Sequence, residues 1–480
     1  MLLHMISNGF LSHLFQQSYD SGKIPSDWSK ALVATIFKKG TKSSPEHYGP
    51  ISLTCILCKV MEHVVLSNLW SHLNLHNIIL KFQHGFRSGL SCETQLIEAI
   101  HDWSLAIDQE RQVDLVLLDF SKAFDKVPHT RLHAKLDFYG VRGQTKSWIQ
   151  AFLSHRSQCV SVNGVLSGSA DVTSGVPQGS VLGPALFLLY INDISDSISS
   201  PMRLFADDSI LYRQINSQTD HDILQQDLNK LCQWSRDWLM DFNVTKCYLM
   251  TITTKTKPSI SQYSMFDQPL TRVTSSKYLG VTVDSKLSWR DHINDVTSKS
   301  CKALGMAKRT LGPCSREVKE LAYSSLVRPK LEYGSVAWNP HSQHSVDKLQ
   351  RVQRAAARFV MNDHRRSTSV SDLLNTLNWK SLESRRLHSQ LSMLHKIKNG
   401  LVHITVPPQL LLSPRLTRNN DPNKYIQVQC RTNIYAYSFY PRTIRVWNTL
   451  PSSILTLPLP SFQTAVRALP LTVPAHLARF

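Results

Sequence analysis

The sequence lacks the features of a secreted or membrane-spanning protein. Its longest apolar run, residues 181–191, is too short to cross a bilayer and is interrupted by Gly183 and Pro184. Residues 1–15 contain neither the basic stretch nor the small-residue cleavage site of a signal peptide. We therefore expect an intracellular protein, nuclear, cytoplasmic or both, without a membrane partner.

Cysteine is sparse and shows no pairing pattern. The 9 cysteines are scattered, and only Cys55 and Cys58 form a C-x-x-C pair. No second pair of cysteines or histidines follows to complete a zinc site, so we interpret the cysteines as reduced thiols. The chain also lacks low-complexity segments and solenoid repeats. Its 480 residues, 42% apolar and 19% charged, are typical of a globular protein with about two to four structural units.

Acidic residues are scarce in the last two-fifths of the chain. Residues 281–480 contain 29 Lys and Arg against 11 Asp and Glu, whereas residues 1–280 contain 25 against 24. This region therefore holds +18 of the net charge of +19. Because concentrated positive charge attracts polyanions, the asymmetry indicates a nucleic-acid-binding part joined to a more balanced catalytic body. A merely solubilising basic surface is the alternative.

The hydrophobic pattern predicts a mixed chain of helices and strands. Helices are expected at residues 6–20, 55–74, 91–109, 181–191 and 220–240, and over most of 291–400. Strands are expected at residues 31–37, 51–54, 113–119, 156–163, 168–173, 202–205, 210–212, 247–254 and 277–283. Ten prolines follow Val402, and they predict an irregular tail over residues 401–480.

Three carboxylates are expected to meet at the end of the central strand. Asp119 ends the strand at 113–119, and Asp207 and Asp208 lie in the turn of a predicted hairpin. Such a cluster is electrostatically costly unless divalent cations neutralise it. Mg²⁺ prefers oxygen ligands, and two ions about 4 Å apart can clamp a phosphoryl transfer. Taken alone, an Asp-Asp turn is more typical of local hydrogen bonding, because Asp is common in turns as a capping residue.

The order of three segments carries a family resemblance. They are LLDFSKAFDKV at 117–127, SGVPQGSVLGP at 174–184 and FADDS at 205–209. These segments resemble motifs A, B and C of reverse transcriptases, and more narrowly those of non-long-terminal-repeat retrotransposons of the Jockey-like kind. Flanking segments agree in the same order: FKKG at 37–40, YGPISL at 48–53, QHGFR at 83–87, KYLGV at 277–281, LVRP at 326–329 and QRAAARF at 353–359.

The resemblance implies an α+β right-hand polymerase with an antiparallel-sheet palm, mixed fingers and a helical thumb. The implied divisions are fingers at 1–112, a palm at 113–290, a basic thumb or connection at 291–400 and the tail at 401–480. Complete elements of the family also carry an endonuclease, and we expect the fingers here to be amino-terminally truncated. The implied reaction adds deoxynucleotides to a primer 3′-hydroxyl on an RNA template. The implied partners are RNA template, DNA primer, RNA–DNA hybrid and deoxynucleoside triphosphates, and the oligomeric state stays open.

The same resemblance implies the catalytic residues. In the family, residues matching Asp119, Asp207 and Asp208 bind two Mg²⁺ ions, which Mn²⁺ can replace. One ion lowers the pKa of the primer hydroxyl, and the other neutralises the triphosphate and pyrophosphate. Lys246 matches a lysine able to protonate the pyrophosphate. A surface lysine at a helix end is an equally good interpretation of Lys246.

A nucleotide pocket is implied as well. Phe124 matches the bulky residue that excludes a ribose 2′-hydroxyl, which disfavours an RNA-templated RNA polymerase; an ordinary core aromatic is the alternative. Gln178 can hydrogen-bond the nucleotide, and Gly179 allows close approach of the backbone. The other implied contacts are Phe120, Lys38, Lys39 and Arg87 at the nucleotide and Tyr278, Leu279 and Gly280 at the primer grip.

Residues 346–361 form a predicted amphipathic helix in the basic region. At 100° per residue its apolar residues share one arc: Leu349, Val352, Ala356, Phe359 and Val360. Its arginines lie opposite: Arg351, Arg354 and Arg358. We expect the apolar arc to pack in the thumb and the arginines to grip phosphates without reading bases. A solvated basic face is the alternative.

Gly49 is the main departure from the family pattern. The family usually places an arginine there, whose guanidinium contacts the triphosphate. Lys38, Lys39 or Arg87 could supply the missing charge. Three hypotheses therefore remain: a working RNA-directed DNA polymerase, a catalytically weakened relic that binds RNA, and an RNA-templated RNA polymerase, which Phe124 disfavours.

Overall fold

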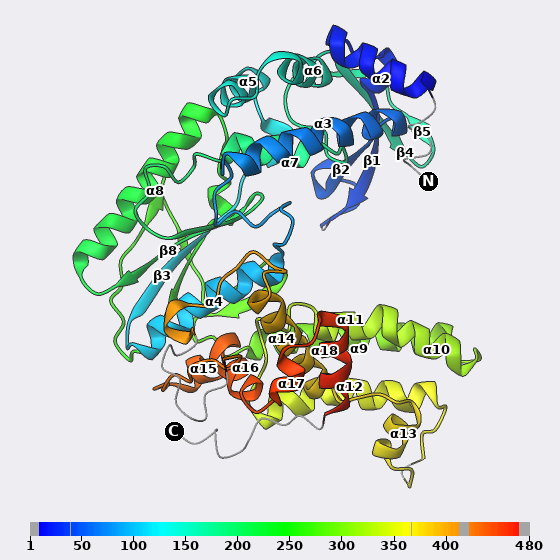
Figure 1. Ribbon diagram of the computed structural model, residues 1–480, viewed down its shortest axis with the longest axis vertical. Helices are drawn as coiled ribbons and strands as arrows, with labels where there is room; N and C mark the ends of the chain where they lie inside the picture. The colour runs from blue at the N-terminus through cyan, green and yellow to red at the C-terminus, as the bar shows by residue number, and fades with distance from the viewer. Residues whose placement is uncertain (1–8, 39, 366, 412–421, 470–480) are drawn as a thin grey trace.

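The computed structural model describes residues 9–38, 40–365, 367–411 and 422–469. Figure 1 shows an arch in which a central sheet joins an upper lobe, made of amino-terminal and middle segments, to a lower lobe of carboxy-terminal helices. The combination of a largely antiparallel central sheet, a mixed upper lobe and a helical lower lobe agrees with the predicted α+β right-hand fold. In the described part of the chain, no helix combines the length and apolar content needed to cross a membrane.

The central sheet has the strand order β12-β9-β3-β8-β7. Its middle strand β3 (Gln112–Leu118) is buried at every position and pairs antiparallel with β8 (Asp208–Ile215) and β9 (Tyr248–Ile252). The strand β7 (Met202–Phe205) forms a hairpin with β8, and β12 (Thr271–Arg272) runs parallel to β9. The sequence runs predicted as strands at 113–119, 202–205 and 247–254 thus lie side by side.

Helices cover both faces of this sheet, which explains why β3 reads as a continuous apolar run. Val113, Leu115 and Leu117 pack on α4 (Cys92–Asp108) and the carboxy-terminal helices. The other face carries Val116 and Leu118. It packs on α7 (Gly183–Ile191) and α8 (Gln218–Trp238). Alternate side chains of one strand therefore serve two cores.

The upper lobe holds a second sheet, in the order β2-β1-β4-β5 with β6 beside β4. Its strands are β1 (Lys30–Phe37), β2 (Tyr48–Leu53), β4 (Arg156–Val162), β5 (Val165–Leu166) and β6 (Ala170–Val172). The helices of this lobe are α2 (Gly9–Ser21), α3 (Ile56–Leu75), α5 (His129–Phe138) and α6 (Gly143–Leu153). As predicted, a hairpin turns at Asn163 and Gly164, which have φ of 51° and 83°.

The lower lobe begins with the predicted helical region. Its helices are α9 (Arg290–Thr310), α10 (Arg316–Ala322), α11 (Arg328–Glu332), α12 (Gln343–Val360), α13 (Val370–Thr376) and α14 (Leu382–Lys398). Two small hairpins lie between the lobes in sequence: β10 (Ser264–Met265) with β11 (Gln268–Pro269), and β13 (Ser275–Tyr278) with β14 (Val281–Asp284).

The prediction of one strand at 277–283 is wrong. The chain reverses at Leu279 and Gly280, which have φ of 46° and 80°, so the segment forms the two strands β13 and β14. A leucine rarely adopts positive φ and gives no turn signal in the sequence.

The prediction of an irregular tail is also wrong for the described part of residues 401–480. Four helices lie there: α15 (Asn433–Ala436), α16 (Phe439–Trp447), α17 (Ser452–Leu455) and α18 (Leu459–Ala468). Pro451, Pro458 and Pro460 lie at helix starts, where a missing N–H breaks no hydrogen bond. Trp447 and Phe462 are fully buried in the core that α14 shares, so the segment is an integral part of the lower lobe.

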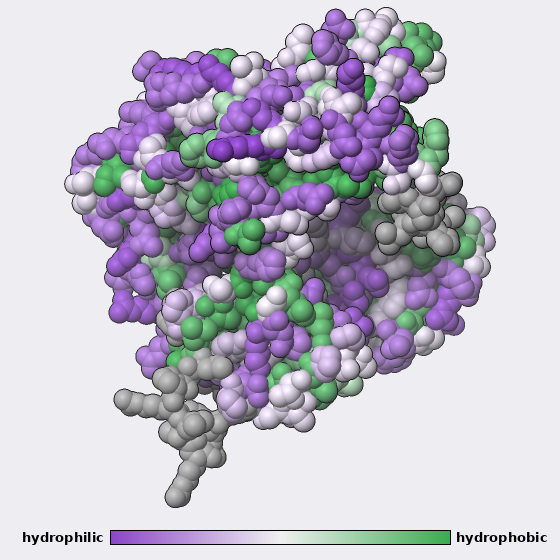
Figure 2. Space-filling model, turned by 45° about the horizontal axis from the view of Figure 1, so that its top comes forward, coloured by the Kyte–Doolittle hydropathy of each residue, from purple (hydrophilic) through white to green (hydrophobic). Residues whose placement is uncertain are grey.

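Figure 2 shows the face between the two lobes. The surface is hollowed there, and the deep part of the hollow is coloured mainly hydrophilic. The central sheet lies between the lobes, so the ends of its strands are the natural place to look for polar chemistry.

Candidate active site

The three predicted carboxylates lie together at one end of the central sheet. Strands β3 and β8 pair as far as Leu118 and Ser209. Asp119 comes directly after Leu118 and Asp208 directly before Ser209, so the two aspartates lie at the same end of these neighbouring strands. Phe205 pairs with Asp208, which leaves Ala206 and Asp207 as a two-residue turn. Ala206 has a φ of 53°, as a tight hairpin turn requires.

The cluster concentrates negative charge in a partly desolvated place. Desolvation, with added repulsion from Asp207 and Asp119, raises the pKa of Asp208 to about 6. Desolvation and the charge of Asp119 also raise the pKa of Asp207, while a backbone N–H and Lys38 act in the opposite direction. Carboxylates held in this way gain stability when a cation joins them.

Oxygen atoms suited to a divalent cation are present in this cluster. Oδ2 of Asp119 is buried and accepts no hydrogen bond. Nζ of Lys246 lies 3.4 Å from this oxygen, in an ion pair of half-exposed side chains. Among the described residues, no three Asp, Glu, His or Cys side chains already surround a common point as ligands. Carboxylate oxygens are the donors that Mg²⁺ and Mn²⁺ prefer, and the Asp119 carboxylate is paired with Lys246.

The segment after Asp119 is anchored to the loop before β9. The N–H of Asn243 donates to the Asp119 carbonyl at 2.7 Å, and the Asp119 N–H lies 3.4 Å from Sγ of Cys247. Phe120 stacks on Phe242 with ring centroids 4.5 Å apart, and it is buried. The Phe120 side chain therefore packs in the core, so a nucleotide contact at this position would come from its main chain.

Phe124 lies half-buried at the border between the core and the site. Its ring stacks on Phe187 at 4.4 Å, and the edge of Phe86 lies 6.2 Å away. The Phe124 carbonyl accepts a hydrogen bond from Val176 at 2.8 Å. These contacts fix the direction of the ring and leave part of it exposed.

Gln178 and Gly179 connect strand β2 of the upper lobe with Asp125, the residue after Phe124. Nε2 of Gln178 donates to Asp125 at 2.9 Å, and the Gln178 carbonyl accepts from the N–H of Ser52 at 2.7 Å. A Cβ on Gly179, which has a φ of 108°, would lie 2.6 Å from the Ser52 carbonyl oxygen. Gln178 and Asp125 line a cavity of about 330 Å³ together with Lys122.

Of the basic residues predicted at the nucleotide, Lys38 faces the site and Arg87 does not. The charge of Lys38 acts on Asp207 and on Asp125. The guanidinium of Arg87 donates to the carbonyls of Leu80 and Gln83 at 2.8 and 3.3 Å, and burial lowers its pKa. Lys39 lies outside the described residues.

In the sequence, Gln83 is only a landmark of the family, and no local pattern indicates its contact with the turn at Ala206 and Asp207. Oε1 of Gln83, a buried residue, accepts from the N–H groups of Gly85 and Ala206, both at 2.8 Å. A Cβ on Gly85 would lie 2.3 Å from the Ala206 nitrogen. The segment at 83–85 therefore supports the turn that carries Asp207 from beneath.

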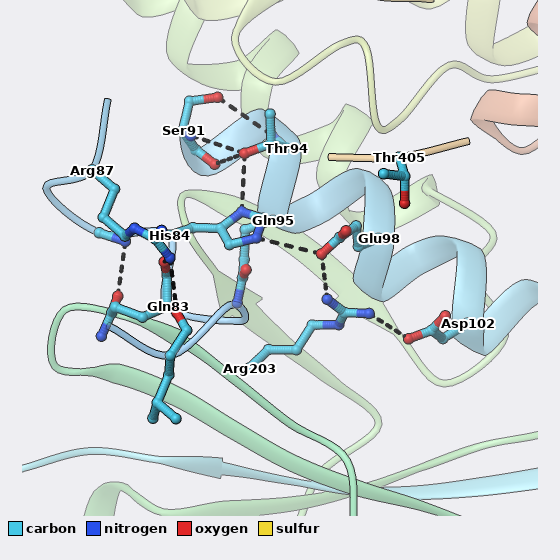
Figure 3. Close-up of polar contacts among 12 residues, drawn as sticks. Gln83, His84, Arg87, Ser91, Thr94, Gln95, Glu98, Asp102, Arg203 and Thr405 are labelled. Carbon is cyan, nitrogen blue, oxygen red and sulfur yellow. Dashed lines mark hydrogen bonds and ion pairs between the residues drawn. The ribbon is translucent and has the colours of Figure 1, made fainter. Parts of the chain in front are cut away.

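A polar network ties this segment to α4 (Figure 3). His84 contacts Thr94 at 2.9 Å and Glu98 at 3.4 Å. Arg203, on strand β7 of the hairpin that carries Asp207 and Asp208, bonds Glu98 and also Asp102 at 2.7 Å. Two turns of one helix thus hold both the supporting segment and the hairpin.

The predicted primer-grip residues form the turn between β13 and β14. Tyr278 and Leu279 are buried, and the Tyr278 hydroxyl accepts from Gln95 at 3.0 Å. The Leu279 carbonyl accepts from the Tyr333 hydroxyl at 3.1 Å, and a Cβ on Gly280 would lie 2.8 Å from that ring. The turn is therefore fixed against Tyr333, and its side chains face the core.

The basic helix predicted at 346–361 is the larger part of α12. All five residues of its predicted apolar arc are buried, as the periodicity indicated. Arg351 and Arg354 are exposed on the opposite side. Arg358 is half-buried, and its guanidinium donates to the carbonyls of Arg365 at 2.8 Å and Thr368 at 3.1 Å. Arg358 is thus engaged in holding the following loop.

The profile described as "Reverse transcriptase (RNA-dependent DNA polymerase)" matches residues 36–283, more than half of the chain and all of the segments that form this site. The chain belongs to the reverse transcriptase family. The predicted resemblance is thereby confirmed, down to the mobile elements of the Jockey-like kind that the following relatives represent.

Three relatives come from Drosophila melanogaster. The "RNA-directed DNA polymerase from mobile element jockey" is 27% identical over 86% of this chain and 47% of its own length. The proteins of transposon X-element and transposon BS, each named a probable RNA-directed DNA polymerase, are 27% and 28% identical, over 70% of this chain and 38% of their own lengths. The chain thus spans less than half the length of these curated relatives.

Among solved structures, apo telomerase from Candida tropicalis is similar with a TM-score of 0.42 at 12% identity, over 83% of this chain and 68% of that one. A second structure, a telomerase from the same organism with a fragment of telomeric RNA, has a TM-score of 0.40 at 10% identity, over 77% of this chain and 67% of that one.

Proposed function

We propose that the chain is an RNA-directed DNA polymerase that extends a primer 3′-hydroxyl with deoxynucleotides on an RNA template. The observation that carries this proposal is the convergence of Asp119, Asp207 and Asp208, with raised pKa values at the last two, in a chain of the reverse transcriptase family. The relatives named RNA-directed DNA polymerases support the same reaction.

In this proposal the three aspartates hold two Mg²⁺ or Mn²⁺ ions. Bound there, the ions supply Lewis acidity for the primer hydroxyl and neutralise the phosphates. The chain's own residues position the reactants: the fixed two-residue turn directs Asp207, and the bond from Asn243 holds the main chain at Asp119. Lys246, beside Asp119, holds the proton that is delivered to the departing pyrophosphate.

The nucleotide lies between the upper lobe and the central sheet in this proposal. Phe124 is the surface that excludes a 2′-hydroxyl, because its stack on Phe187 prevents the ring from moving aside. Lys38 faces the triphosphate, and Gln178 holds the pocket through Asp125. The main-chain turn at Leu279 and Gly280 supports the primer end. We assign the fingers to the upper lobe, whose sheet also takes β4, β5 and β6 from the predicted palm range 113–290. The palm is the central sheet, on which α4 from the predicted fingers range 1–112 packs. The thumb is 291–400, and we join the helical segment after 401 to it.

Primer extension tests the reaction. The wild-type chain is expected to extend a DNA primer on an RNA template with Mg²⁺ or Mn²⁺, and Asp207→Asn is expected to lose at least a thousandfold of this activity while keeping its fold, because the amide cannot replace the carboxylate charge. Asp222→Asn, on the exposed side of α8, is the matched control and should leave extension unchanged. Residual Asp207→Asn activity within tenfold of the wild type would contradict the proposal.

A catalytically weakened relic that binds RNA is the second candidate, and the glycine at position 49 favours it. The same assay distinguishes the two functions. A chain that binds an RNA–DNA hybrid but fails to extend it with either metal is the relic. For an active chain, Phe124→Ala is expected to admit ribonucleotides, and unchanged sugar discrimination would return Phe124 to a purely structural role.

A further inference from the structure

A cavity of about 650 Å³ lies in the lower lobe, apart from the aspartate cluster. It is bordered by the loop after β14, the start of α9, the start of α12 and α15. Its basic side chains are Lys286, Arg290, Lys348, His341 and His344. None of the residues that line it in the described part of the chain is Asp or Glu.

None of the ion pairs among the described residues includes Lys286, Arg290 or Lys348, and the carboxylate of Asp295 on α9 pairs instead with Lys277 and Lys299. Lys286 and Arg290 are exposed, and Nζ of Lys348 donates to the neutral amide oxygen of Asn294. The nearby carboxylate of Asp284 is buried and accepts from the main chain of the loop, including the N–H groups of Ser288 at 3.0 Å and of Trp289 at 3.1 Å. Asp284 therefore shapes the loop.

The first turn of α12 adds to the positive potential. Its cap residue Ser342 makes no side-chain cap bond, and the turn contains no acidic residue. The first N–H groups of an 18-residue helix thus face this region without a side-chain acceptor, which favours a nearby anion. The partial positive charge of this helix end adds to the charges of Lys286, Arg290 and Lys348.

A flat aromatic pair stands at the same cavity. The rings of His341 and Tyr437 stack at 4.4 Å with an angle of 9° between their planes. The outer face of the exposed His341 is a platform of the kind on which single-stranded bases stack. Phosphate-binding cations beside such a platform match a nucleic-acid strand better than a small anion.

We propose that this cavity binds a single strand of nucleic acid through its phosphates, with a base against His341. The bound nucleic acid would lie outside the polymerase centre. Strand β14 separates the loop at Lys286 from the predicted primer-grip turn, and its four residues span roughly 13 Å. The binding does not depend on catalysis, so it stands or falls separately from the proposed polymerase activity.

The test measures affinity for a fluorescently labelled single-stranded RNA against salt concentration. We expect the triple variant Lys286→Gln, Arg290→Gln, Lys348→Gln to bind at least tenfold more weakly at low salt. Its log–log salt slope should fall by about 2, because each lost phosphate contact on a single strand contributes roughly 0.7. His341→Ala should weaken binding with an unchanged slope, since stacking releases no counterion.

The matched control removes three exposed charges from the carboxy-terminal half of α9, away from the cavity: Lys302→Gln, Lys308→Gln and Arg309→Gln. Arg309 lies about 28 Å along α9 from Arg290. Equal losses in both triple variants would assign the effect to net charge and overturn the site, as would unchanged binding of the first variant. Inorganic phosphate is also compared with unlabelled RNA as a competitor, at equal total concentrations of phosphate groups. If the two displace the labelled RNA equally well, the cavity is a small-anion site and the proposal of strand binding is overturned. The variant Asp207→Asn should bind the RNA normally, which separates this result from failure of the proposed activity.

Discussion

The side chain of Lys38 lies directly over the backbone of Gly49. A Cβ at position 49 would be 2.3 Å from Cε of Lys38, so this lysine fills the space in which any side chain at 49 would begin. The strands β1 and β2 bring the two residues together, because Phe37 pairs with Tyr48 and the Lys38 N–H donates to the His47 carbonyl at 2.8 Å. We infer that Lys38 supplies from the neighbouring strand the charge that an arginine at 49 would supply.

A substitution pair tests this relationship. Lys38→Ala is expected to raise KM for the deoxynucleotide by roughly 10- to 100-fold, the value of a charge-assisted hydrogen bond, with a smaller change in kcat. In the Lys38→Ala background, Gly49→Arg should recover most of this loss, because the space over position 49 is then free. Steady-state kinetics of single-nucleotide incorporation give both constants.

The control is the effect of Gly49→Arg when Lys38 is still present. Gly49→Arg alone should gain less than in the Lys38→Ala background, because the flexible end of Lys38 must first move away from the new Cβ, which would lie 2.3 Å from its Cε. If Lys38→Ala leaves KM unchanged, or if Gly49→Arg is equally effective with and without Lys38, the two residues do not share one role.

The raised pKa of Asp208 predicts a pH dependence of stability in the metal-free protein. The folded carboxyl binds its proton with a pKa of about 6, above the ordinary value of 3.8, so between these values the folded state holds more protons than the unfolded state. The contribution of Asp208 to stability is therefore present below pH 3.8 and is lost as pH rises through about 6. Urea unfolding with a chelator at pH 5, 6 and 7 should show this trend.

Other groups titrate in the same range, so the comparison is with Asp208→Asn. Burial lowers the pKa values of His292 and His388 to about 4. Their contribution to the stability of the folded protein is therefore lost as pH falls toward 4. The difference between the wild type and Asp208→Asn cancels their effect. Relative to the variant, the wild type should lose stability from pH 5 to pH 7, and Mg²⁺ should abolish that loss. A difference independent of pH would show that burial and the neighbouring aspartates do not raise the pKa of Asp208.

Gln83 is predicted to position the catalytic turn. Gln83→Met keeps the size of the side chain but leaves the N–H groups of Gly85 and Ala206 without their acceptor, which costs about 1–3 kcal/mol. Because the turn carries Asp207, we expect extension to fall at least tenfold and the Mg²⁺ concentration for half-maximal activity to rise. Titration of primer extension with Mg²⁺ measures both.

Gln112→Met is the matched control for Gln83. Gln112 is also buried and loses comparable hydrogen bonds, to Asp114 and Ser259, but it lies at the opposite end of β3 from the cluster. It should lower the free energy of unfolding without moving the Mg²⁺ requirement. If the two variants have the same Mg²⁺ titration, Gln83 is a structural residue only.

Much of this architecture is readable from local sequence. The run VDLVLL predicts a buried strand because it is apolar at nearly every position, and the catalytic hairpin follows from two short apolar runs around Asp207 and Asp208. The helices after Leu410 were hidden because Pro451 and Pro458 read as breakers, although they begin helices. The burial of Trp447 that stabilises them comes from α14, a contact that no local window contains.

The direction of side chains is the part of the site that sequence could not give. Phe120 and Phe124 lie four residues apart in one motif, yet one ring is in the core and the other borders the site. The motif itself does not distinguish them. Arg87 similarly reads as a free cation, whereas its partners are carbonyls of its own loop. Gln83 illustrates the converse, a positioning residue visible only when its contact to Ala206 is known.

The arginines of α12 yield a prediction with an internal control. Arg351 and Arg354 are exposed opposite the buried arc, while Arg358 bonds two carbonyls of the following loop. Replacing Arg351 and Arg354 with Gln should weaken binding of an RNA–DNA hybrid equally for all sequences, since phosphate contacts carry no base information. The log–log slope of affinity against salt should fall by up to about 1.8, because each contact on a duplex contributes roughly 0.9.

Arg358→Gln should act differently, although it removes the same charge from the same helix. Its guanidinium has main-chain partners at 2.8 and 3.1 Å, so we expect a loss of about 1–3 kcal/mol in the free energy of unfolding and little change in the salt slope. Hybrid affinity measured at several salt concentrations, together with urea unfolding, separates the two effects. Superimposed slopes for the wild type and the Arg351→Gln, Arg354→Gln variant would make this face a solvated surface. Loss of binding for one sequence alone would mean that the helix reads bases, because a grip on phosphates weakens all sequences together.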